Sequence, residues 1–217
     1  TKSTELYNKQ SFSGQAYLWL GEAYYIKENM ISARENIVNF IGTPQGKTAE
    51  QLQKAYYLLG YTYFNAKDYD NAAIYFDTFA SIQNADKSPV YDDVLNRLGD
   101  SYFNKRNFTL ARKTYNKVST SSKVADYAQY QSAFILGLQK QYNAKIELLN
   151  TLITKYPHSD YNDDAMYEIG RTYVLQDKHT EAIEAYKKLQ KRHPQSKLTR
   201  KASLEIGMQY ANINKNE

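Results

Sequence analysis

The sequence predicts an all-α fold in which antiparallel helix pairs stack into a solenoid, and three observations support this. One small residue recurs every 34 to 39 positions, at Gly21, Gly60, Gly99, Ala133, Gly170 and Gly207. A tyrosine follows it by three positions in five of these units, and an alanine follows it by twelve in four. Residues 125–159 also align without a gap on the residues 37 positions further on. Such a period is the signature of a repeat architecture.

Each unit is expected to contain two amphipathic helices, because its apolar residues recur at i, i+3, i+4 and i+7. The small residue lets the two backbones approach closely. We expect one solenoid over residues 1–217 with about five and a half repeats, and residues 1–11 as the end of a preceding helix. The predicted repeats are 12–47, 48–87, 88–121, 122–158, 159–195 and the partial unit 196–217.

The starts of the first helices carry capping signals. Thr48 and Gln51 form a capping-box pattern at the second unit. A serine stands eleven residues before the small position in four units, where its side chain is predicted to cap the helix. These serines are Ser88, Ser122, Ser159 and Ser196.

The last unit contains a first helix only. Its apolar face, formed by Leu204, Ile206, Tyr210 and Ile213, has no second helix to cover it, whereas terminal repeats normally carry a polar outer face. We therefore expect the chain to be a piece of a longer repeat array.

Composition excludes several function classes. A net charge of +5 is too small for a phosphate-binding surface, so no nucleic acid is expected as a partner. The chain has no cysteine, which removes thiol catalysis and cysteine-based zinc sites. It also lacks an apolar run of membrane-spanning length. No hydrolase, P-loop or dinucleotide motif occurs, so we expect no enzyme activity and no cofactor.

The segment YPHSDYNDDA, residues 156–165, looks at first like a cation site. Its repeat partner HPQSKLTRKA lacks the acids, and the D-x-D-x-D-G spacing of a calcium loop is missing. We therefore predict no metal at His158, Asp160, Asp163 and Asp164. The three aspartates are expected in first helical turns, where carboxylates complement the helix dipole.

The repeat unit resembles the tetratricopeptide repeat (TPR). In AYYLLGYTYFNAKDYDNAAIYFDTF, the matching residues are Tyr56, Leu59, Gly60, Tyr63, Ala72 and Phe76. The fourth unit departs from the pattern, with Ala133 in place of glycine and Lys145 in place of alanine. The resemblance implies a right-handed superhelix whose concave surface is lined by the first helices. It also implies that this surface binds a protein or peptide.

The family offset places groove residues six and three positions before the small residue and one after it. The partner-binding candidates are Tyr57, Tyr61, Asp93, Asn96, Asp100, Tyr127, Tyr130, Phe134, Tyr167 and Arg171. Aromatic side chains are common anchors of protein recognition. Aromatic groups on both sides of an acidic band suit a partner segment with hydrophobic residues around a basic centre.

Two functions remain open. The first is a non-catalytic protein-interaction scaffold, and the alternative is a glycan-binding TPR module that uses tyrosine platforms. The YP-x-S and HP-x-S junctions are similar to those of bacterial envelope TPR proteins, which favours the periplasm or the outer membrane over the cytoplasm. Membrane association would then run through segments outside this chain. The basic run 187–201 is the alternative contact for an acidic partner or an anionic membrane surface.

Overall fold

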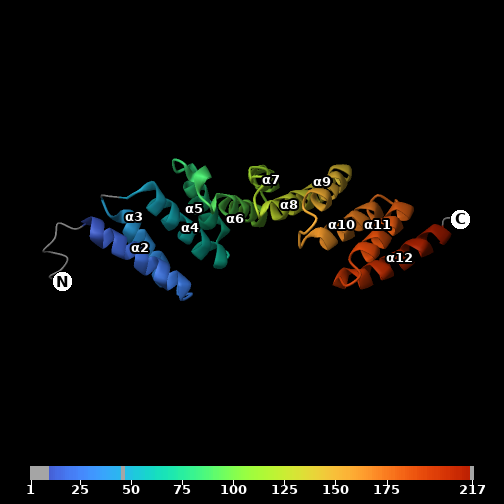
Figure 1. Ribbon diagram of the computed structural model, residues 1–217, viewed down its shortest axis with the longest axis horizontal. Helices are drawn as coiled ribbons and strands as arrows, with labels where there is room; N and C mark the ends of the chain where they lie inside the picture. The colour runs from blue at the N-terminus through green and yellow to red at the C-terminus, as the bar shows by residue number, and fades with distance from the viewer. Residues whose placement is uncertain (1–9, 45–46, 216–217) are drawn as a thin grey trace. The chain divides into compact units, whose positions relative to one another are not determined.

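The computed structural model describes residues 10–44 and 47–215, and only the backbone of residues 10–13 and 215. This part of the chain forms eleven α-helices, one short 3-10 helix and no strand (Figure 1). The all-α prediction is therefore confirmed. The helices are α2 (Gln10–Ile26), α3 (Met30–Gly42), α4 (Ala49–Asn65), α5 (Tyr69–Ser81), η1 (Ala85–Lys87), α6 (Tyr91–Asn104), α7 (Phe108–Tyr115), α8 (Ala125–Leu138), α9 (Tyr142–Lys155), α10 (Asn162–Val174), α11 (His179–Arg192) and α12 (Lys197–Lys215).

The helices pair as the repeat pattern predicts. Packed neighbours are α2 with α3, α4 with α5, α6 with α7, α8 with α9, and α10 with α11, while α12 packs on α11. The contacts divide the chain into two compact units. The first unit ends at Lys117, and the second begins at Val118. Unit 1 contains α2 to α7 and unit 2 contains α8 to α12. A single continuous array over residues 1–217 stays a prediction, and most of the helix predicted at residues 1–11 lies outside the described residues.

The small repeat position has a steric cause. A Cβ atom on Gly60 would lie 2.4 Å from the Phe76 ring, and one on Gly170 would lie 2.5 Å from the Tyr186 ring. Both rings come from the second helix of the same repeat and are fully buried. A bulky buried ring sixteen residues after the glycine therefore fixes how closely the two helices pack.

The fourth repeat packs despite its departures from the pattern. Leu149 replaces the ring, and both Leu149 and Ala133 are buried. Lys145 is buried too, and its Nζ donates to Glu168 Oε2 at 2.6 Å in the next repeat. A buried lysine needs such a partner, because an unpaired charge in the interior is costly.

The turn inside each complete repeat uses left-handed backbone at a residue other than glycine. The φ angle lies between 57° and 60° at Glu28, Lys67, Arg106, Lys140 and Asp177. In three repeats the next residue caps the second helix by accepting from the N–H three positions on. These caps are Asn29, Asp68 and Asn107.

The capping predictions for the first helices are partly wrong. The capping box is confirmed, since Thr48 Oγ1 accepts from the Gln51 N–H and Gln51 Oε1 accepts from the Thr48 N–H. However, α6, α8 and α10 have Val90, Val124 and Tyr161 at their caps, two residues after the predicted serines, and these caps make no side-chain bond. Ser196 does directly precede α12, and its Oγ accepts from the Leu198 N–H at 3.0 Å.

The serines at two junctions of unit 2 instead join successive repeats. Ser159 Oγ accepts from the Tyr161 N–H at 3.1 Å and donates to Asp126 Oδ2 at 2.6 Å. Ser196 Oγ likewise donates to Asp163 Oδ2 at 2.5 Å. The hydroxyl therefore closes a local turn and also bonds to the preceding first helix.

Candidate functional site

Three of the predicted groove residues converge in unit 1. Tyr57 and Tyr61 lie one turn apart on α4, and both point toward Asp93 on α6. The hydroxyl of Tyr57 donates to Asp93 Oδ2 at 3.3 Å, and that of Tyr61 donates to the same oxygen at 2.5 Å. The repeat brings residues 32 and 36 positions apart onto one carboxylate. We call these three residues the Tyr-Asp site.

The rings of the Tyr-Asp site are half-buried and held by further rings. The Tyr57 and Tyr61 centroids lie 4.9 Å apart with planes tilted by 58°, and Tyr61 packs edge-on against Phe76 at 5.5 Å. Burial, followed by the hydrogen bond to Asp93 and its charge, raises the pKa of Tyr61 far above its usual range. Tyr61 is therefore a neutral donor throughout the physiological pH range.

The carboxylate of Asp93 keeps part of its charge accessible. Its side chain is 28% exposed, and Arg97 Nε lies 3.8 Å from Oδ1. Arg97 also donates to Asp100 Oδ2 at 2.6 Å, so one guanidinium serves two carboxylates. These three charged groups together carry one net negative charge.

A cavity of about 530 Å³ adjoins the Tyr-Asp site. Tyr57 and Phe79 supply part of its wall, and the segment from Asn84 to Val90 supplies another part. At its edge Lys54 Nζ pairs with Glu22 Oε2 at 2.6 Å. The cavity therefore joins apolar walls to a charged rim, as ligand sites usually do.

Two predicted residues of unit 1 are not accessible. Asn96 is 1% exposed and Asp100 is 6% exposed. Asp100 Oδ1 accepts from the Tyr115 hydroxyl at 2.6 Å, so this carboxylate ties α6 to α7. Of the predicted acidic band Asp93, Asn96 and Asp100, only Asp93 is partly exposed.

In unit 2 two of the predicted aromatic residues of α8, Tyr127 and Tyr130, lie against Tyr161. The Tyr130 ring stacks on Tyr161 at 5.3 Å with planes 23° apart, and the Tyr127 ring lies 5.8 Å from it. Phe134 is 37% exposed. Burial and then the charges of Asp164 and Glu168 raise the pKa of Tyr130.

The two candidates on α10 have structural partners as well. Tyr167 packs on Tyr186 at 5.5 Å. Arg171 Nη1 donates to Glu168 Oε1 at 2.7 Å, on the same carboxylate that receives Lys145. In unit 2 the predicted residues thus do not form a single site: Tyr127 and Tyr130 lie against Tyr161, and Arg171 pairs with Glu168.

The acids near residue 160 take positions in a turn and a helix start. Asp163 and Asp164 lie in the first turn of α10, as predicted, whereas Asp160 lies in the turn before it. Burial and the charges of Asp163 and Glu168 raise the pKa of Asp164. Among the described residues, no group of three or more His, Cys, Asp or Glu side chains is placed to hold a metal ion.

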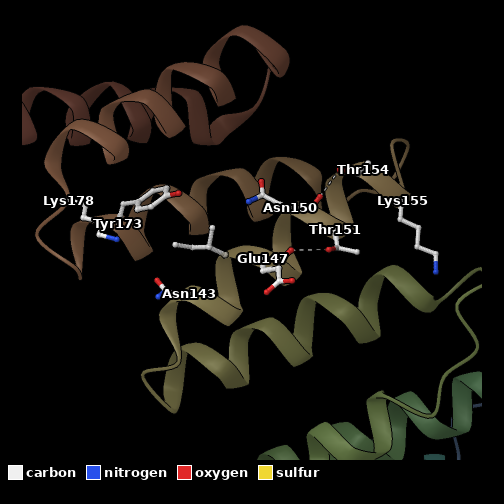
Figure 2. Close-up of a pocket in the computed structure, with 9 residues that line it drawn as sticks. Asn143, Glu147, Asn150, Thr151, Thr154, Lys155, Tyr173 and Lys178 are labelled. Carbon is white, nitrogen blue, oxygen red and sulfur yellow. Dashed lines mark hydrogen bonds between the residues drawn. The ribbon is translucent and has the colours of Figure 1, made fainter.

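Two adjoining cavities in unit 2 were not predicted from the sequence. One, of about 680 Å³, runs along α9 and reaches Tyr173 and Lys178 (Figure 2). The other, of about 320 Å³, lies between α9 and α11 with Met166 of α10 among its lining residues. The signal in the sequence is Ala185, which stands where the second repeat has Tyr75.

No helix within residues 10–44 and 47–215 is both long and apolar enough to cross a bilayer.

Comparison with solved structures places the fold among known repeat proteins. YrrB, described as a TPR protein with an unusual peptide-binding site, aligns with a TM-score of 0.68 at 18% identity, over 90% of this chain and 93% of its own. MamA residues 41 to the end from Desulfovibrio magneticus RS-1 give 0.65 at 16% identity, covering 85% and 97% of the two chains. A further MamA structure gives 0.61 at 23%, covering 76% and 84%.

The sequence comparisons identify the repeat itself. No curated protein sequence matches the chain. Tetratricopeptide-repeat family models match residues 53–86, 92–123, 127–159 and 164–196, which together make up more than half of the chain. These ranges cover four of the helix pairs, from α4 to α11. The chain therefore belongs to the tetratricopeptide-repeat family.

Proposed function

We propose that the chain is a non-catalytic scaffold that binds a peptide segment of a protein partner at the Tyr-Asp site of unit 1. The observation that carries the proposal is the convergence of the Tyr57 and Tyr61 hydroxyls on the partly exposed carboxylate of Asp93. The binding residue of the peptide is a lysine or arginine with apolar neighbours.

The chemistry of the site favours such a residue. A cation beside Asp93 gains a charge-assisted hydrogen bond, which is stronger than one between neutral groups. The tyrosine rings offer faces for cation–π contact and for the apolar stem of the basic side chain. The two hydroxyls fix the carboxylate before binding, so that little side-chain entropy is lost on association.

The adjoining cavity supports the second part of the proposal. Its wall of Tyr57, Phe79 and Val90 suits an apolar neighbour of the basic residue. The Lys54–Glu22 pair at the edge can exchange partners with polar backbone groups of a bound peptide. The description of YrrB as a TPR protein with a peptide-binding site supports the same ligand class.

The glycan alternative has less support. Sugar platforms need open, flat ring faces, whereas the Tyr57 and Tyr61 rings are half-buried and tilted against each other. A location in the bacterial envelope is a proposal that rests on the junction sequences alone.

Selection from a displayed library of random peptides tests the proposed function. We expect the selected peptides to be enriched in a lysine or arginine beside apolar residues. Asp93→Asn should weaken a selected peptide by about 2 kcal/mol, as expected for a central contact. Asp77→Asn is the matched control, because it removes the same charge from an exposed position on α5.

Two results would contradict the proposal. One is a set of selected peptides without enrichment of basic residues. The other is equal loss of affinity in Asp93→Asn and Asp77→Asn, since this would indicate a general charge effect rather than a site. Equal melting temperatures of the variants and the wild type show that a loss of affinity does not result from unfolding.

A further inference from the structure

In unit 1, aromatic side chains fill the space that is bounded by Tyr56 and Tyr63 of α4, Tyr75 of α5 and Arg34 of α3. The Tyr75 ring of α5 stacks on Tyr63 at 5.2 Å and lies 6.3 Å from Tyr56, with planes 17° and 22° apart. The guanidinium of Arg34 from α3 lies over the Tyr63 ring at 4.8 Å. Four side chains therefore close this space.

The equivalent space in unit 2 contains one ring where unit 1 contains three. Gly170 aligns with Gly60, a shift of 110 residues. The positions aligned with Tyr56, Tyr63 and Tyr75 are Met166, Tyr173 and Ala185. Ile146 of α9 takes the repeat position of Arg34. The platform ring Tyr173 is thus retained, while the ring that would stack on it is absent.

A cavity lies where the missing ring would stand. The cavity of about 320 Å³ is lined by Met166, Tyr173 and Ala185. It adjoins the cavity of about 680 Å³, with which it shares Asn150, Thr154 and Tyr173. Figure 2 shows the larger cavity, with the three shared residues Tyr173, Asn150 and Thr154 among its lining side chains.

We propose that this cavity binds a tyrosine side chain presented by a partner protein, in the position that Tyr75 occupies in unit 1. The stack of Tyr75 on Tyr63 provides the template for the bound ring on Tyr173. This site is separate from the Tyr-Asp site and does not depend on the function proposed for that site.

The charges at the rim favour an uncharged anchor. The two cavities are bordered by three acidic and four basic side chains of α9, α11 and the turn between α10 and α11, so neither sign dominates. These are Glu147, Glu181, Glu184, Lys155, Lys178, Lys188 and Arg192. The lining of the smaller cavity combines the apolar Met166 and Ile169 with the polar, exposed Asn150 and Thr154. An apolar ring with one polar tip matches this lining.

The three methionines of the chain give a direct test. Met166 lines the cavity, whereas Met30 at the start of α3 and Met208 on α12 lie elsewhere. Carbon-13 methyl NMR follows all three during titration with para-cresol, the free side chain of tyrosine. A second titration uses a glycine-serine peptide with one central tyrosine. The same peptide with alanine in place of tyrosine is the ligand control.

Variants of the cavity complete the experiment. Ala185→Tyr restores the ring of the second repeat and should fill the cavity, and Tyr173→Ala removes the platform. Thr180→Tyr adds the same ring to an exposed position of α11 outside the cavity and is the matched control. Circular dichroism and melting curves verify that each variant is folded, and Ala185→Tyr keeps the test valid if Tyr173→Ala unfolds.

We expect a saturable shift of the Met166 methyl signal with para-cresol and with the tyrosine peptide, and none with the alanine peptide. The affinity should fall at least tenfold in Ala185→Tyr and remain unchanged in Thr180→Tyr. Three results would overturn the proposal: no shift in the wild type, equal shifts at all three methionines, or undiminished binding in Ala185→Tyr. Self-association of the wild type that Ala185→Tyr abolishes would also overturn it, since the occupant would then be a second copy.

Discussion

Gly170 and Gly207 hold the same repeat position but differ in what surrounds them. A Cβ atom on Gly170 would meet the Tyr186 ring at 2.5 Å, whereas none of the described atoms lies within 4 Å of a Cβ on Gly207. Both glycines lie inside helices. The same substitution therefore tests two opposite effects, steric overlap and helix propensity.

We predict that Gly170→Ala destabilises the protein by about 1–3 kcal/mol, because the ring must move in a close-packed core. Gly207→Ala should instead stabilise by up to about 1 kcal/mol, because alanine loses less backbone entropy in a helix. Urea unfolding monitored by circular dichroism measures both. Equal losses of stability in the two variants would contradict the steric explanation.

Because of the buried pair of Lys145 and Glu168, the unfolding free energy should fall as the solution becomes acidic. Burial acts to raise the pKa of Glu168, but the hydrogen bond and charge of Lys145, and then those of Arg171, outweigh it and lower this pKa. A carboxylate with a lowered pKa in the folded state contributes stability above its unfolded pKa, near 4.3. This contribution is lost as the pH falls through the lower folded value.

Glu168→Gln should therefore cost stability at neutral pH and flatten the fall in unfolding free energy below about pH 4.3. Urea titrations from neutral pH to the acid limit measure the slope. Glu184→Gln, at an exposed position of α11, is the control and should leave the acid slope unchanged. A Glu168→Gln slope equal to that of the wild type would show that the pair does not set the acid behaviour.

At the scale of single residues, the repeat period predicted the close contact between the two helices of a repeat. It did not predict the buried rings that require glycine at this contact. The spacing of Gly60 and Gly170 gave their position in the first helix. The rings that require glycine lie sixteen residues away, and this pairing emerges only when both helices are in place. Lys145 has no family equivalent, and its partner Glu168 lies in the next repeat, so their pairing depends on tertiary packing.

At the scale of elements, helix existence was predicted better than helix starts. The predicted serine caps of α6, α8 and α10 were misplaced by two residues. At α8 and α10 the serine hydroxyl accepts from an N–H in the turn before the helix begins. The left-handed turn residues, such as Lys67 and Lys140, gave no sequence signal, since glycine is the residue that normally marks this conformation.

Ser159 should matter more for stability than Ser122. Ser159 Oγ accepts from the Tyr161 N–H and donates to Asp126, whereas Ser122 Oγ accepts from the Val124 N–H at a long 3.4 Å. We predict that Ser159→Ala costs about 1–2 kcal/mol, because it removes two hydrogen bonds, one of them to a charged group. Ser122→Ala should cost less than half of that amount.

Thermal and urea unfolding of the two serine variants check this prediction. A double-mutant cycle of Ser159→Ala with Asp126→Ala isolates the bond between the repeats. Additive effects in the cycle would show that this bond contributes nothing to stability.

At the scale of the whole molecule, the family offset assigns residues to one face of the first helices but does not predict how exposed each of them is. Tyr57, Tyr61 and Asp93 meet because the same offsets recur in successive repeats. Asn96 and Asp100 share those offsets but are buried, since burial depends on the volume of neighbouring side chains rather than on register. The cavity at Ala185 was missed because an absent ring is visible only when one repeat is compared with another.

Hydrogen–deuterium exchange with a peptide selected on the wild type tests the central claim, that the first-helix face of unit 1 binds the partner. Binding should slow amide exchange in α4 and α6, which carry the Tyr-Asp site, while α3 and α7 keep their free-state rates. The protection should disappear in Asp93→Asn and persist in Asp77→Asn. Protection confined to helices other than α4 and α6, or unchanged protection in Asp93→Asn, would contradict the account.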